Sequence, residues 1–133
     1  MRNHSEFEPN YIEAERFVLG MLLAGKHCAE NILGKLTSDD FYHSLNAEVF
    51  DTACALFHEN IPISAETVND RMAQMHGGSA FNRKYVSWLA EQAPEEVFAE
   101  YCCHLVLYYS AERDEDFVDE RGSVYDENFL PFD

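Results

Sequence analysis

Positive charge is scarce in this sequence. Nine lysines and arginines stand against 25 aspartates and glutamates, which gives a formal net charge of −16 at pH 7. Proteins bind nucleic acid mainly through cations that neutralise phosphates, so direct nucleic-acid binding is not expected. Basic protein surfaces are the natural partners of such an acidic chain. The alternative interpretation is that the acidity only confers solubility.

Long apolar runs are also missing. No stretch approaches the roughly 18 apolar residues of a membrane span. The apolar run 17–24 is short and follows acidic residues, unlike a secretory signal. The 133 residues suit one domain, and 47% of them are apolar, which is enough for a core. We therefore expect one cytoplasmic domain with no membrane segment.

Residues arranged for chemistry are few. The sequence has no C-x-x-C pair, no histidines at metal-binding spacing, no Gly-x-x-x-x-Gly-Lys-Ser/Thr loop and no nucleophile elbow. Asp39, Asp40 and His43 have the residue types of a small metal-dependent hydrolase, but acids that stabilise a helix start beside a surface histidine are the preferred interpretation. We expect no catalytic residue, metal, cofactor or small-molecule substrate. The cysteines expected to be reduced and mostly buried are Cys28, Cys54, Cys102 and Cys103.

Apolar residues recur at helical spacing along most of the chain, and no segment alternates with the period of a strand. The pattern predicts an all-α fold, a compact bundle of about six helices. The expected helices are 11–23, 26–36, 44–59, 65–76, 83–92 and a sixth that opens at Pro94 and extends to about 119. Ser44 and Ser64 are expected N-caps, and Met75 is expected to face the core. Gly20 indicates that another helix passes close to the first.

Composition divides the chain into three segments. Residues 1–9 predict a flexible arm, residues 10–113 a helical domain, and residues 114–133 an acidic C-terminal tail. Acidic runs are usually only solvated, but spaced aromatic residues in such a tail are typical of docking peptides. The tail aromatics proposed to contact a partner are Phe117, Phe129 and Phe132.

Several short motifs follow one another in a recognisable order. They are Ile12-Glu13-Ala14-Glu15-Arg16-Phe17-Val18-Leu19-Gly20-Met21-Leu22-Leu23, Asp40-Phe41-Tyr42 with Val49-Phe50, Pro62-Ile63 with Thr67-Val68, and Tyr85, Leu89, Pro94, Tyr101 and Arg113. In this order the chain resembles, over residues 10–113, the N-terminal domain of bacterial DnaB-type replicative helicases. Ser64 stands where that family usually has Asp, and Asn82-Arg83 stand where it often has Gly-Gly.

The resemblance implies a helical collar domain of a hexameric ring, which pairs through a C-terminal helical hairpin and binds the helicase-binding end of the primase. It therefore implies a non-catalytic protein–protein interaction module of DNA replication that binds or regulates a replicative helicase, its loader or a primase. The sequence contains no motor motif, and its acidic tail stands where the second hairpin helix is expected. A stand-alone plasmid or phage protein that engages a replisome fits this pattern.

The sixth expected helix carries a second candidate contact surface. If exposed, this surface is expected to form a homodimer or to bind a partner helix, whereas part of it has the composition of ordinary core. Its proposed contact residues are Phe98, Tyr101, Leu105, Tyr108 and Tyr109. An alternative function is an acidic decoy that occupies the DNA-binding surface of a basic protein, which the charge of −16 and the acidic tail favour.

Overall fold

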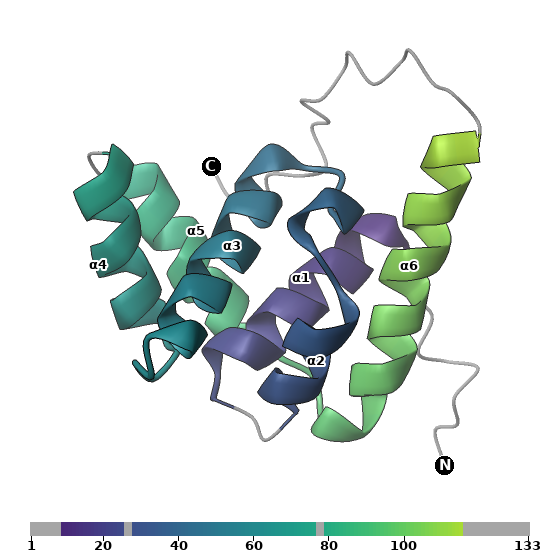
Figure 1. Cartoon of the computed structure of the whole chain (residues 1–133), viewed down its shortest axis with the longest axis horizontal. Helices are drawn as coiled ribbons and strands as arrows, with labels where there is room; N and C mark the ends of the chain where they lie inside the picture. The colour runs from purple at the N-terminus through teal and green to yellow at the C-terminus, as the bar shows by residue number, and fades with distance from the viewer. Residues whose placement is uncertain (1–8, 26–27, 77–78, 116–133) are drawn as a thin grey trace.

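The computed structural model describes residues 9–25, 28–76 and 79–115. These residues form α1 (Tyr11–Leu23), α2 (Ala29–Lys35), α3 (Ser44–His58), α4 (Ala65–His76), α5 (Ala80–Glu91) and α6 (Ala99–Glu115), with two 3-10 turns, η2 (Ser38–Asp40) and η3 (Glu96–Phe98). The described residues include no strand, so the predicted all-α class is confirmed (Figure 1). None of the described helices is long and apolar enough to cross a membrane.

Helix α1 forms the centre of the bundle, with α3, α5 and α6 packed around it (Figure 1). Its bounds match the prediction, and Asn10 is its N-cap. The Asn10 side chain accepts a hydrogen bond from the Glu13 amide at 2.9 Å, and the Glu13 carboxylate accepts one from the Asn10 amide at 3.0 Å. This reciprocal cap satisfies two amides that a helix start leaves open. Gly25, with φ of 72°, follows the end of the helix.

Gly20 lies where the end of α5 crosses α1. A Cβ atom at this position would lie 2.5 Å from the Leu89 carbonyl oxygen and 3.2 Å from the Ala93 Cα. Only a residue without a side chain allows this approach. The close helix contact predicted from Gly20 is therefore confirmed.

The start of α5 departs from prediction, whereas α3 and α4 begin where predicted. Ser79 caps α5, because its hydroxyl accepts a hydrogen bond from the Asn82 amide at 3.0 Å, so α5 begins three residues before the expected Arg83. Ser64 caps α4 as expected, accepting from the Thr67 amide at 3.1 Å. Ser44 is the first residue of α3 rather than its cap.

The starts of α6 and α2 differ from the predicted positions, and several predicted segments lie outside the described residues. Pro94 precedes η3, and α6 begins only at Ala99. Helix α2 begins at Ala29, and the expected start at Lys26 lies outside the described residues. The same holds for the expected extension of the sixth helix to 119, for the arm 1–8, and for Phe117, Phe129 and Phe132. The three-segment division therefore stays a prediction.

The core contains most of the expected apolar side chains, with one clear exception. Met75 of α4 is 63% exposed rather than buried, while Met72 one turn earlier is buried. Cys102 and Cys103 are buried and Cys28 and Cys54 are half-buried, and all four are free thiols. Burial raises the pKa of the Cys102 thiol to about 12 and that of Cys103 to about 11. Both thiols therefore stay protonated near neutral pH and are poor nucleophiles.

Candidate functional site

The turn η2 fastens α6 to the rest of the domain. One Asp40 carboxylate oxygen accepts a hydrogen bond from the Thr37 amide at 2.9 Å, and the other accepts one from the Ser110 hydroxyl at 3.0 Å. Arg113 donates to the Asp40 carbonyl at 2.8 Å, and its guanidinium lies 5.2 Å from the centroid of the Tyr42 ring. Asp40 therefore has a structural task, in which its carboxylate joins the turn to the last helix.

The metal-hydrolase hypothesis rested on Asp39, Asp40 and His43. His43 is buried, so its interpretation as a surface histidine is wrong. Its ring packs against Tyr42, with centroids 4.9 Å apart, and against Tyr11, with centroids 6.2 Å apart. Across residues 9–25, 28–76 and 79–115, no three His, Cys, Asp or Glu side chains are placed to hold a metal ion.

A buried polar network connects three helices, and no sequence pattern indicated it. Glu15 of α1 accepts hydrogen bonds from the Tyr42 amide at 2.7 Å and from the Asn46 side chain at 2.9 Å. The amide oxygen of Asn46 in turn accepts one from the Tyr85 hydroxyl at 2.5 Å. Glu15 is therefore a buried link between α1, α3 and α5.

Burial shifts the ionisation of this network. Desolvation raises the pKa of Glu15, opposed by the hydrogen bonds from Asn46 and Tyr42 and by the charge of Arg113. Desolvation likewise raises the pKa of Tyr85. The Arg16 guanidinium, next to Glu15 in the chain, lies 5.3 Å from the centroid of Trp88. These perturbed groups hold helices together in the interior of the domain, and we assign them to the framework.

Helix α6 has an inner and an outer face, and both are rich in apolar residues. The inner face, which packs on α1, α2 and η2, carries the buried Ala99, Cys102, Cys103 and Val106. The outer face carries Val97 from η3, Tyr101, Leu107 and Tyr108, which are 71%, 41%, 39% and 51% exposed. Figure 1 shows α6 at the edge of the bundle, with its neighbours on one side. Large apolar side chains that stay exposed together on one face are candidate contacts with a partner, so the outer face is the candidate site.

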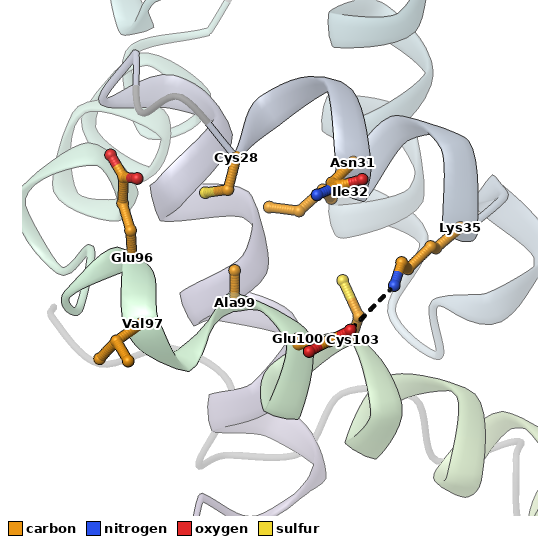
Figure 2. Close-up of a pocket in the computed structure, with 9 residues that line it drawn as sticks. All are labelled: Cys28, Asn31, Ile32, Lys35, Glu96, Val97, Ala99, Glu100 and Cys103. Carbon is orange, nitrogen blue, oxygen red and sulfur yellow. Dashed lines mark ion pairs between the residues drawn. The ribbon is translucent and has the colours of Figure 1, made fainter.

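A groove borders this face where α2 meets η3 and α6. Its deeper part is a pocket of about 240 Å³. Cys28, just before α2, and Ile32 of α2 line it together with Val97 and Cys103. Figure 2 shows these side chains around the space, with the Lys35 ammonium paired to Glu100 at its rim. The nitrogen and the carboxylate oxygen of that ion pair are 3.5 Å apart, and both side chains are exposed.

A shallower depression of about 500 Å³ continues the groove over Tyr101, His104 and Leu107. The two parts share Lys35, Glu100 and Cys103, so they form one surface. The groove lies beside the apolar outer face of α6 and gives that face a concave edge.

The structure divides the contact residues proposed on the sixth helix. Tyr101 and Tyr108 lie on the outer face, while Phe98 and Leu105 are half-buried against the core. Tyr109 is half-buried, and its ring centroid lies 6.1 Å from that of Tyr11 in α1. Sequence reasoning missed Leu107, and it missed Lys35 and Glu100 at the groove. The spacing 97, 101, 104 and 108 follows one helical face but contains none of these three residues.

Comparison with known proteins decides the family. The model of the DnaB-like helicase N-terminal domain matches residues 8–107, which is most of the chain. The chain belongs to this family. The crystal structure of the N-terminal domain of DnaB helicase from Mycobacterium tuberculosis is similar, with 26% sequence identity and a TM-score of 0.70 over 81% of this chain and 78% of that one. No curated protein matches the chain.

The resemblance to the DnaB N-terminal domain is therefore confirmed, and these 133 residues contain no motor domain of that helicase. The family match ends at residue 107, within α6. Tyr108 and Glu112 lie beyond it, in the last described turns of the same helix. The outer face of α6 therefore extends beyond the residues that the family model matches.

Proposed function

We propose that the protein is a non-catalytic interaction module of DNA replication, which binds or regulates a replicative helicase, its loader or a primase. The observation that carries the proposal is the match of residues 8–107 to the N-terminal domain of DnaB-like helicases. The exposed apolar face of α6 supports it, because a contiguous apolar surface on a small domain commonly marks a protein interface.

The chemistry of the described residues favours binding over catalysis. The pKa values of Tyr85, Cys102 and Cys103 are raised, and burial is the first cause at each. Burial raises the pKa of all three, which keeps them protonated and unreactive near neutral pH. The function we propose therefore depends on surface complementarity.

We assign the contact to the outer face of α6, with Tyr101 and Tyr108 as its aromatic anchors. Aromatic residues carry much of the binding energy at protein interfaces. Phe98, Leu105 and Tyr109 hold the helix in place from its inner side. The tail residues Phe117, Phe129 and Phe132 remain proposed contacts, and a homodimer through α6 is the alternative use of the same face.

Calorimetry tests the proposal. The full chain is titrated with the purified replicative helicase, helicase loader and primase of its own organism. We expect at least one of the three to bind with a dissociation constant of about 1 μM or tighter. Absence of binding to all three contradicts the proposal.

The charge of −16 favours one alternative, an acidic decoy that occupies the DNA-binding surface of a basic protein. The two functions differ in what competes with binding. Duplex DNA displaces a decoy from its target, and the decoy's affinity collapses between about 50 and about 300 mM salt because charges are screened over about 10 Å at 0.1 M. Binding that survives both conditions excludes the decoy.

A further inference from the structure

The outer face of η3 and α6 combines exposed apolar side chains with acidic ones. Glu96 flanks Val97, Glu100 flanks Tyr101, and Glu112 lies one turn beyond Tyr108, all exposed. The Glu112 carboxylate, through its charge and a hydrogen bond, raises the pKa of the Tyr108 hydroxyl, which places the two groups together. The surface therefore offers apolar contact and negative charge within the same few turns of helix.

Among the described residues of α2, η3 and α6, the lysine and arginine side chains are those of Lys35 and Arg113. Lys35 is already paired with Glu100. Arg113, the cation in the last turn of α6, points inward to the Asp40 carbonyl. The balance of charge on the outer face is therefore negative, like that of the whole chain.

The negative charge of the outer face favours binding to a different protein over binding to a second copy of this chain. In a twofold dimer both copies contribute the same patch. Pairing α6 with α6 would bring Glu96, Glu100 and Glu112 toward the same acids of another chain of charge −16. Like-charge repulsion opposes that contact, whereas cations on a partner would be attracted to it.

We propose that the outer face of α6, with the adjoining α2–α6 groove, is a docking site for a basic amphipathic helix of a partner protein. The inference rests on the proposed function and specifies the chemistry of its partner. Helix α6 is about 25 Å long at 1.5 Å per residue, so a helix of about 15 residues can lie along it. Helices that dock in this way present apolar anchors at i, i+3, i+4 and i+7.

The fit follows from the positions already described. Apolar anchors of the incoming helix contact Val97, Tyr101 and Leu107, and one of them enters the pocket beside Ile32 and Cys103. Its lysines or arginines face the glutamates along the edge. Glu100 is accessible, since its side chain is 85% exposed and its pairing with Lys35 is long at 3.5 Å. Exposed pairs of this kind are weak and readily exchanged.

The test uses synthetic peptides with the full chain. The probe is an amphipathic peptide of about 18 residues with leucines at i, i+3, i+4 and i+7 and lysines elsewhere. A second peptide has glutamate in place of every lysine. Titration of isotope-labelled protein, followed by NMR, is expected to show binding of the lysine peptide, with shifts over residues 96–112 and 28–35. Shifts centred on α4 and α5, or equal binding of the glutamate peptide, would overturn the proposal.

Matched variants distinguish an effect of charges on α6 from an effect of the protein's total charge. The double variant Glu100→Gln with Glu112→Gln should weaken binding of the lysine peptide several-fold. The double variant Glu66→Gln with Glu91→Gln removes the same charge from α4 and α5 and should leave the affinity of the peptide within about twofold of the wild type. Tyr101→Ser with Leu107→Ser should weaken it about tenfold or more. Met75→Ser, which removes an exposed apolar side chain from α4, should have little effect. Equal losses in the two charge pairs would contradict a site on α6.

Two further results distinguish this inference from the proposed function. Sedimentation of the free protein is expected to show a monomer, and a dimer that Tyr101→Ser dissociates would assign the face to a second copy instead. If a replication partner binds but the α6 variants do not weaken it, the docking site is wrong and the proposed function stands. If the lysine peptide binds on α6 but no replication partner does, the site stands and the proposed function fails.

Discussion

Arg113 donates a hydrogen bond to the main-chain carbonyl of Asp40, 73 positions earlier in the chain. With the Ser110–Asp40 hydrogen bond, this contact holds the second half of α6 against the turn η2. The outer face of α6 is thereby presented on a fixed helix. A fixed surface loses less entropy on binding than one that must first be ordered.

Substitution of Arg113 tests this attachment. Arg113→Ala removes a charged hydrogen bond and a cation–π contact, and should cost about 1–3 kcal/mol of unfolding free energy. Urea denaturation measures the loss. Arg71→Ala breaks an exposed ion pair with Glu59 and is the control, with a much smaller loss expected. Equal losses in both variants would show that the Arg113 contact has no special role.

The helix crossing at Gly20 gives a prediction with an internal control. Gly20→Ala would place a Cβ atom 2.5 Å from the Leu89 carbonyl oxygen. The resulting strain should cost about 1–3 kcal/mol, more than the gain in helix propensity of about 1 kcal/mol. Gly34→Ala in α2 meets no atom within 4 Å and should be neutral or stabilising. Thermal unfolding of both variants checks the sign of each change.

The buried carboxyl of Glu15 predicts a pH dependence of stability. Burial raises its pKa above the ordinary value of 4.5, so in the pH range just above 4.5 the folded state holds the proton more tightly than the unfolded state does. Stability from this group is therefore present at low pH and is lost as pH rises through that range. The free energy of unfolding of the wild type, minus that of Glu15→Gln, should fall with rising pH there. A difference that stays constant or increases would contradict the assignment.

Much of the fold follows from local signals in the sequence. The bounds of α1 and α4 were predicted from apolar spacing, with Ser64 as the cap of α4, and Gly20 indicated the helix crossing. The exposure of Met75 was not predictable, since methionine next to an apolar stripe has the same pattern whether or not another helix covers it.

The site was predictable only in part, for the same physical reason. Apolar residues occur on both faces of the helix that carries Tyr101, Leu105, Tyr108 and Tyr109, and only the packing of α6 on α1, α2 and η2 decides which of them are buried. Glu15 and Asn46 had no signal at all, because their partners are 27 to 39 positions away in the chain. Polar residues of this kind are expected at the surface until the fold brings their partners together.

The two adjacent cysteines of α6 provide a chemical check on its orientation. Cys102 and Cys103 are buried, and burial raises the pKa of both thiols. Both should resist alkylation by iodoacetamide at pH 8 in the folded protein and react fully in urea. Mass spectrometry of the digested protein assigns the labels. Rapid labelling of both in the folded protein would mean that α6 does not present this face to α1.

Hydrogen-exchange mass spectrometry on a complex tests the central claim most directly. The full chain is measured alone and with whichever of the replicative helicase, its loader or the primase binds it. Our account predicts slower exchange over residues 96–112 and in α2, and unchanged exchange in α4, because the contact lies on the outer face of α6. Protection centred on α4 and α5, with residues 96–112 unchanged, would contradict it.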